Sequence, residues 1–391
     1  MGVIRLILAL VVLIFHCPEG VIPRFLHPAL AVQCFYAISG FLMQLVIQRY
    51  QQSGGQYWYM AFYKSRAFRL LPLYWIFAFL MIVFCNNGVL GGFSSIGNIQ
   101  GILIYCVTNI VILGQDILRL VYYDLDSHQF HILPAFTEDM KVVLTPHTIF
   151  GSAFTVMGQS WTLSVEMWFY LLVPFLLLRR IEVLIGIIGL SILSRCVWAH
   201  YGYTHHTFMY GIIMNEIAIF LSGALAARFY RYWLEDGKIL RLLSRYTSER
   251  QAQWLVKSLG FIALPLLIEY YYEGWNYFPS GGSWDSGLLN VPYKWWAVIL
   301  FTVLSLPFLF YSMSRLKIDR FIGDLSYPVY ISHFFIISLL EKTSLSKEML
   351  VVYTMLLSIT VSIIMIYTVE RPLDKLRHRL FLNKKAKLSF A

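Results

Sequence analysis

An arginine and a histidine bracket the first apolar segment of the chain, "RLILALVVLIFH", which runs from Arg5 to His16. A helix advances about 100° and 1.5 Å per residue, so these two side chains share one face, roughly 16 Å apart. A neutral imidazole inside an apolar bundle can serve as a general base or a nucleophile. The alternatives are an Arg5 stem that carries its charge to the headgroups and a His16 that is a packed core residue. Both are candidate catalytic residues.

A carboxylate lies inside another apolar run, "QSWTLSVEMWFYLLVP", residues 159–174. An ionisable side chain at the middle of a bilayer costs about 2.5–3.5 kcal/mol on insertion scales and usually faces the interior of a bundle. Glu166 therefore needs a partner, for which His16 or an arginine would serve. A structural ion pair or hydrogen bond is the alternative, and we count Glu166 as a candidate catalytic residue.

Two arginines, Arg66 and Arg69, open a span in "FYKSRAFRLLPLYW". Residues three apart are neighbours on one helix face, and guanidinium groups hold phosphate oxygens in bidentate geometry. The pair is a candidate clamp for a phosphorylated donor, although a cationic anchor at the membrane surface explains it without a ligand. In "FYAISGFLMQLVI", Ser39 and Gly40 allow a neighbouring backbone to approach closely. Ser39 is added to the donor-binding candidates.

The composition indicates which elements position these groups. Of the 391 residues, 58% are hydrophobic and 13% are charged, against about 45–50% and 25% in a soluble domain. We therefore expect an all-α polytopic membrane protein, with the lipid bilayer as a partner and no nucleic-acid partner. The five cysteines lie without paired spacing, so neither a disulfide framework nor a metal site is expected.

Apolar runs of spanning or near-spanning length follow one another along the chain. They lie at about 2–16, 29–48, 68–84, 98–114, 160–178, 182–199, 212–229, 255–272, 295–312, 325–340 and 350–369. Basic clusters follow alternate runs, which places those loops and both termini in the cytoplasm.

Eleven runs cannot return the chain to its starting side, so a bundle of about 10–11 transmembrane helices is expected, with about ten full spans. Segment 98–114 is then re-entrant or on the outer surface; the alternative is a second short crossing between 115 and 159. We expect one transmembrane domain over residues 1–372 and a basic cytoplasmic tail over 373–391.

Aromatic residues are frequent in the loops expected outside, where a sugar could stack on their faces. The candidate acceptor-binding residues are Trp161, Tyr271, Trp275 and Trp284. An interfacial aromatic belt is the simpler interpretation of such residues. His333, in "YISHFF" within another span, is a candidate to support the site, with a packed core histidine as the alternative.

Taken together, these segments resemble the bacterial membrane acyltransferase-3 family, whose members O-acylate cell-surface glycans. The resemblance rests on six segments in order: Arg5-x10-His16, "FYAISGF", "RAFRLLPLYW", "SWTLSVEMWFY", "IGDLSYPVYISH" and "VERP". It implies about ten helices in the bacterial inner membrane, a cytoplasmic acyl-CoA donor (acetyl-CoA by family frequency) and a glycan acceptor, lipid-linked or free, towards the periplasm. It also implies that His16 is catalytic, that Arg66 and Arg69 meet the donor, and that Glu166 supports the site.

Two departures from this resemblance are expected: a shorter amino terminus than many members have before the first helix, and no fused hydrolase-like domain of the kind that some members carry. Transfer would then be completed within the membrane unit or by a separate partner. In that scheme His16 deprotonates a sugar hydroxyl that attacks the thioester, or accepts the acyl group first. Glu166 orients or charge-balances the imidazole, as the acid of a triad does, and Arg5 contacts the donor or sets the local field.

Two other functional classes also fit buried charges among some ten helices. The first is a secondary transporter, although transporters often show internal repeats and none is visible here. The second is a glycosyltransferase or polymerase that acts on lipid-linked sugars, for which an external carboxylate would be the expected base.

Overall fold

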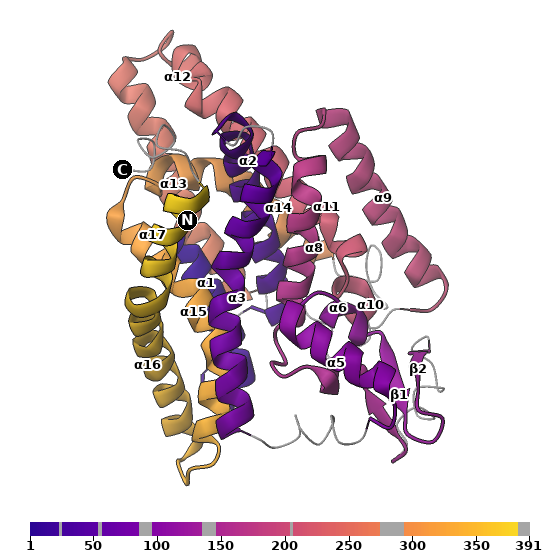
Figure 1. Ribbon diagram of the computed structural model, residues 1–391. Helices are drawn as coiled ribbons and strands as arrows, with labels where there is room; N and C mark the ends of the chain where they lie inside the picture. Colours follow the sequence, from indigo (N-terminus) through magenta and orange to yellow (C-terminus); the bar gives the residue numbers. More distant parts are fainter. Residues whose placement is uncertain are drawn as a thin grey trace.

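The computed structural model describes residues 1–22, 26–53, 57–85, 96–134, 146–203, 206–273 and 293–381, which form a helical bundle with a small sheet at one end (Figure 1). Eight helices within these ranges are long and apolar enough to cross a membrane. They are α2 (Pro28–Ser53), α3 (Trp58–Phe84), α9 (Ile181–His200), α11 (Ile213–Phe229), α13 (Glu249–Glu273), α14 (Tyr293–Met313), α15 (Lys317–Leu340) and α16 (Lys347–Met365). The prediction of an all-α polytopic membrane protein is confirmed.

Three shorter apolar helices account for the remaining predicted runs: α1 (Gly2–His16), α5 (Ile99–Val111) and α8 (Trp161–Leu176). At 1.5 Å per residue, α1 and α8 are about 22–24 Å long, less than the ~30 Å of a bilayer's hydrocarbon core. Neither helix can cover the full depth by itself. A short α1 therefore leaves its last residue, His16, inside the bundle.

The segment between α5 and α8 contains the sheet. The chain passes from α5 through the short helix α6 (Gln115–Leu118) to three antiparallel strands in the order β2-β1-β3. These are β1 (Val121–Asp124), β2 (Gln129–Ile132) and β3 (Thr148–Phe150), followed by the 3-10 turn η2 (Gly151–Phe154). No helix long enough to span appears in the described residues between 115 and 159, which favours 98–114 as the partial segment. The sheet itself was not predicted.

Close helix crossings hold the centre of the bundle together. A Cβ atom at Gly40 on α2 would lie 1.8 Å from the Phe220 carbonyl oxygen on α11, and one at Gly223 would lie 1.9 Å from the Ala37 oxygen. Such contacts are possible only where no side chain intervenes, as in other membrane helix pairs built on small residues. The close backbone approach predicted at Gly40 is therefore confirmed.

The Gly40 crossing gives a stability prediction. We expect Gly40→Ala to lower the unfolding temperature in detergent, because the added methyl group meets backbone that cannot rotate away; overpacking typically costs about 1–3 kcal/mol. Gly186→Ala on α9 is the matched control, since a Cβ atom there meets nothing within 4 Å. Equal unfolding temperatures for the two variants would contradict the α2–α11 contact.

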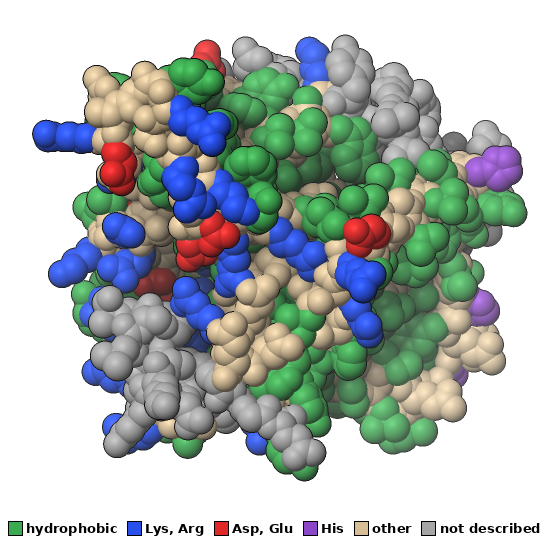
Figure 2. Space-filling model, turned by 90° about the horizontal axis from the view of Figure 1, so that it is seen from above, with side chains coloured by type: hydrophobic (Ala, Val, Ile, Leu, Met, Phe, Trp, Pro, Cys, Tyr) green, Lys and Arg blue, Asp and Glu red, His purple; other side chains and the backbone are tan. Residues whose placement is uncertain are grey.

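The opposite end of the bundle from the sheet is basic. It carries the short helix α12 (Lys238–Leu243), the π-helical turn η6 (Ile366–Glu370) and the helix α17 (Arg371–Phe381). Figure 2, which looks down on this end, shows many Lys and Arg side chains over it. Basic side chains therefore gather at the end of the bundle that carries α12 and α17.

Candidate functional site

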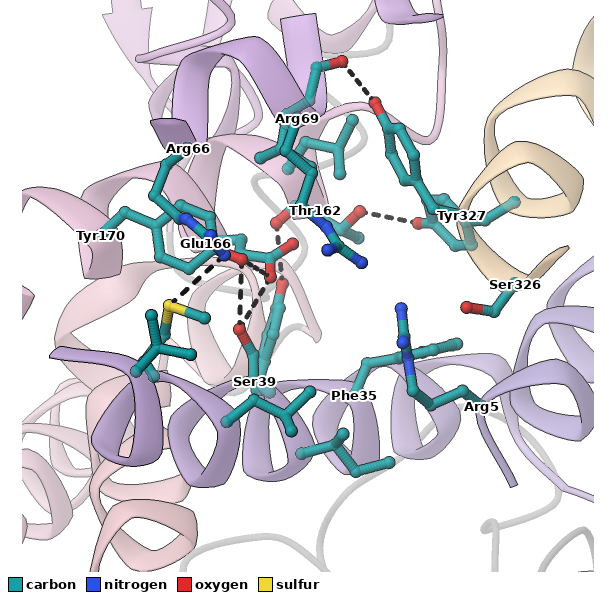
Figure 3. A pocket seen from close by; sticks show the side chains of 18 of the residues that line it. Arg5, Phe35, Ser39, Arg66, Arg69, Thr162, Glu166, Tyr170, Ser326 and Tyr327 are labelled. Carbon is teal, nitrogen blue, oxygen red and sulfur yellow. Dashed lines mark hydrogen bonds between the residues drawn. The ribbon is translucent and has the colours of Figure 1, made fainter. Parts of the chain in front are cut away.

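A cavity of about 380 Å³ lies between α1, α2, α3, α8, α15 and α17, and Figure 3 shows it from close by. Its volume is within the range of ordinary ligand sites. Among the described lining residues, the arginines are Arg5, Arg66, Arg69 and Arg377, and the carboxylates are Glu166 and Asp324. The chain thus brings together, in one site, residues more than 370 positions apart.

Arg66 is buried on α3 and 8% exposed. Its guanidinium carbon lies 5.8 Å from the Phe62 ring centroid and 5.9 Å from that of Tyr170. Nη1 is 3.8 Å from the Met43 sulfur, and the buried Nε has no hydrogen-bond partner within the described part of the chain. Aromatic faces and a thioether therefore hold this cation, and its strong donors remain available to an anion.

Arg69 and Arg5 point toward one another across the cavity (Figure 3). Arg69 lies in the field of Glu370, Asp374 and Asp324. Of the ion pairs between described residues, none involves Arg5 or Arg69. Arg5 therefore faces the site and does not extend to the headgroups, which was the alternative explanation for it.

The position of the arginine pair differs from the sequence prediction in one respect. Arg66 and Arg69 were expected to open a span, but α3 begins at Trp58, so they lie about two and three turns inside the helix. The earlier turns were missed because "WYMAFYKS" mixes polar with apolar residues and has no long apolar run. The pair therefore lines the cavity from within the helix, with Arg66 buried and Arg69 partly buried.

Glu166 has two hydrogen-bond donors in the described structure. The Ser39 hydroxyl donates to Oε1 at 2.8 Å, and the Tyr170 hydroxyl donates to the same oxygen at 2.5 Å. Neither donor is His16, so the triad-like contact between Glu166 and His16 is not formed. Ser39 therefore holds this carboxylate in place. Tyr170, one turn after Glu166, was not identified from the sequence.

His16, the last residue of α1, does not line the cavity. Its Nδ1 is 2.8 Å from the Val12 carbonyl oxygen; because a carbonyl only accepts, Nδ1 carries the proton in the neutral ring, and Nε2 carries the lone pair. The His16 ring centroid is 5.2 Å from that of His333 and 4.6 Å from that of Phe334. The helical hydrogen bond thus sets the tautomer that a base at Nε2 requires.

His333 and Tyr330 on α15 connect the two regions. His333 is fully buried, and neither of its ring nitrogens has a hydrogen-bond partner among the described residues. Its ring centroid is 5.8 Å from that of Tyr330, which lines the cavity and whose hydroxyl lies 2.7 Å from the Thr162 Oγ1. The Tyr330–Thr162 contact therefore separates the arginine cavity from the two histidines.

The four candidate acceptor-binding residues differ in their surroundings. The Arg119 guanidinium carbon lies 3.9 Å from the Trp161 ring centroid, so one face of that indole is already covered. Tyr271 is 1% exposed, and its hydroxyl lies 2.9 Å from the Thr302 Oγ1; it is a packed residue of α13 and offers no outer face to a sugar. Trp275 and Trp284 lie outside the described residues. Within those residues, no group of three His, Cys, Asp or Glu side chains could hold a metal ion.

Comparison with known proteins gives two matches of different kinds. A model of the acyltransferase-3 family, described as "Acyltransferase domain", matches residues 1–369. A protein of Aquifex aeolicus (strain VF5) named "Uncharacterized protein" is 23% identical over 252 residues, which are 63% of this chain and 99% of that protein. No solved structure matches the chain.

Proposed function

We propose a donor and an acceptor for this chain, which belongs to the acyltransferase-3 family and is a membrane acyltransferase. The proposed donor is an acyl-CoA, and the proposed acceptor is a hydroxyl group of a cell-surface or exported glycan. The observation that carries this proposal is the cavity in which four arginines, two of them buried (Arg66 and Arg377), face two carboxylates. An uncompensated cation is costly in a low-dielectric interior. An anionic ligand offsets that cost, and coenzyme A carries several phosphate charges.

The donor phosphates would lie against Arg66 and Arg69, with Arg5 beside them. Guanidinium groups bind phosphate oxygens through two parallel hydrogen bonds, and the spacing of this pair on one face of α3 suits such contacts. We place the Lys- and Arg-rich end of the bundle (Figure 2) in the cytoplasm, because cytoplasmic loops are enriched in these residues. Acyl-CoA, a cytoplasmic metabolite, then reaches the cavity from its own compartment.

The thin pantetheine arm would extend past Tyr330 towards His16. Nε2 of His16 takes the proton of the acceptor hydroxyl, and the oxygen attacks the thioester carbon. The carbon–sulfur bond breaks, and the leaving thiolate takes up the proton that the imidazolium carries. In the second form of this scheme, Nε2 itself attacks the thioester carbon, the carbon–sulfur bond breaks, and coenzyme A leaves as the thiolate. The hydroxyl oxygen then attacks the acyl-imidazole, the bond from Nε2 to the acyl carbon breaks, and the hydroxyl proton passes to the thiolate.

Glu166 contributes differently from the acid of a triad in this scheme. Its hydrogen bonds to Ser39 and Tyr170 hold this carboxyl group in the cavity that the arginines line. The acyl group we propose is acetyl, the commonest in the family, and the membrane is the bacterial inner membrane. His333, in ring contact with His16, supports the orientation of the catalytic imidazole.

Mass spectrometry of surface polysaccharide tests this function. Cells that carry the gene should show a glycan heavier by one acyl group than cells without it, and a His16→Ala copy should not restore the difference. The purified protein in nanodiscs should release coenzyme A thiol from acetyl-CoA when that glycan is added. A different result would favour a transporter: the polysaccharide has the same mass in cells with and without the gene, and the His16→Ala protein still transports a substrate.

A further inference from the structure

Helix α17 begins at Arg371 and lies beyond residues 1–369, the part of the chain that matches the family model. The sequence prediction places residues 373–391 in a tail separate from the transmembrane domain. In the structure, α17 continues from α16 through η6 and packs on α3, the helix that carries Arg66 and Arg69. The beginning of the predicted tail is therefore packed on a wall of the donor cavity.

One residue of α17, Arg377, faces into that cavity. It is 8% exposed, whereas Arg379 on the same helix is exposed. Its Nη2 lies 2.9 Å from the Asp374 Oδ1, one turn earlier. Its Nε and Nη1 are buried and have no hydrogen-bond partner in the part of the chain that the structure describes. Asp374 thus holds one edge of the guanidinium, and the donors of Nε and Nη1 remain unused.

The surroundings of Arg377 make this arrangement unfavourable unless an anion binds. Its electrostatic neighbours include Arg69 and Arg66, which repel it, and Asp374, the carboxylate that attracts it. A buried donor left without an acceptor costs about 1–3 kcal/mol, and more when the group is charged. Two such donors beside two further cations form a site for a ligand with several acidic oxygens.

We infer that Arg377 is a donor-phosphate contact, positioned by Asp374, and that α17 completes the donor site from outside the matched domain. The inference rests on the proposed function, because the phosphate belongs to the proposed acyl-CoA. Nη2 is engaged by Asp374, so Nε and Nη1 meet the phosphate oxygens. Arg66 and Arg69 approach the same nucleotide end of the donor from α3.

Two acyl donors distinguish a phosphate-binding role of Arg377 from a structural role. Acetyl-CoA carries the phosphates, while S-acetylpantetheine has the same thioester and arm without them. We expect Arg377→Gln to raise KM for acetyl-CoA by about tenfold to a hundredfold, the range of a hydrogen bond to a charged group. KM for S-acetylpantetheine and kcat with either donor should stay unchanged. Arg377→Lys should recover part of the affinity, because a point charge replaces a bidentate fork.

Arg379→Gln is the matched control: it removes the same charge from the exposed face of the same helix, and it should leave KM for both donors unchanged. Asp374→Asn should raise KM for acetyl-CoA less than Arg377→Gln does, and it should add nothing in the Arg377→Gln background. An Arg377→Gln enzyme whose KM for acetyl-CoA equals that of Arg379→Gln overturns the inference. So does an equal loss with S-acetylpantetheine, which would indicate a structural effect.

An error in the proposed function would already appear in the wild-type protein and not only in the Arg377 variants. A wild-type protein that releases no thiol from acetyl-CoA overturns the donor assignment, and the inference with it. Should Arg377→Gln not fold, as judged by gel filtration in detergent, Arg377→Lys carries the test. An Arg377→Lys enzyme with wild-type KM for acetyl-CoA contradicts bidentate binding at Arg377.

Discussion

Replacing His16 with alanine should remove acyl transfer, lowering kcat by about 10²- to 10⁴-fold, the usual contribution of a general acid or base. The reason is the tautomer that the structure sets: Nδ1 is bonded to the Val12 carbonyl oxygen, so the neutral ring presents its lone pair at Nε2. The affinity for the donor should not change, because His16 is not among the residues that line the arginine cavity. Thiol release measures kcat, and equilibrium binding of acetyl-CoA measures Kd.

The control for this prediction is His147→Ala. His147 is an exposed histidine that lies 3.2 Å from the Asp126 carboxylate near the sheet, and it is not among the residues that line the cavity. The His147→Ala enzyme should keep full acyltransferase activity. A His16→Ala enzyme with more than a tenth of the wild-type kcat would remove this imidazole from the reaction. A weaker Kd with unchanged kcat would make His16 a donor-binding residue.

Replacing both Arg66 and Arg69 with glutamine should weaken the binding of acetyl-CoA by two orders of magnitude or more. Each guanidinium that contacts a phosphate contributes about 1.5–3 kcal/mol, and the two lie on one face of α3 with no ion pair of their own among the described residues. The loss should appear in Kd and KM. At saturating donor, kcat should fall far less than it does in His16→Ala.

Lys64→Gln is the matched control for the arginine pair. Lys64 lies on the same helix and carries the same charge, but it is exposed, so its removal should leave donor binding unchanged. Equal effects of Lys64→Gln and the double variant would mean that the positive surface attracts the donor without a specific clamp. Raising the salt concentration separates the two cases, because salt screens exposed charges more than buried ones.

The helices could be predicted from the sequence because hydrocarbon thickness sets the length of an apolar run. The first run, 2–16, coincides with α1 (Gly2–His16), and most other ends agree within a few residues. The largest error is at the start of α3, where Trp58 precedes the predicted run by ten residues. That stretch is helical because it packs on neighbouring helices. A mean hydropathy calculated along the sequence does not detect such packing.

Several residues of the site could be named from the sequence, but not their partners, and Tyr170, Asp324 and Arg377 were missed. Buried charge is expensive, so Arg5, His16 and Glu166 stood out inside apolar runs. The structure bonds Glu166 to Ser39 and Tyr170, where the sequence suggested His16 or an arginine. Which polar groups meet across a bundle depends on helix rotation and crossing, and neither is encoded in local spacing.

Arg377, near the end of the chain, was the hardest residue of the site to foresee. His333, which meets His16 across 317 positions, was already a candidate, but Arg377 joins Arg66 from a helix that the sequence placed in a separate tail. The pair Asp374 and Arg377, three residues apart, was a usable signal for a helix with an oriented arginine. Its basic surroundings favoured a cytoplasmic anchor, which is the commoner use of such segments.

A structure of the His16→Ala protein in nanodiscs with acetyl-CoA, determined by electron cryo-microscopy, tests the central claim most directly. That claim is that one ligand meets the arginines with its phosphates and the position of His16 with its thioester. The account predicts phosphate density within hydrogen-bond distance of Arg66 and Arg69, and the thioester carbon beside residue 16, past Tyr330. Phosphate density away from both arginines, or a thioester that stays on the cavity side of Tyr330, would contradict it.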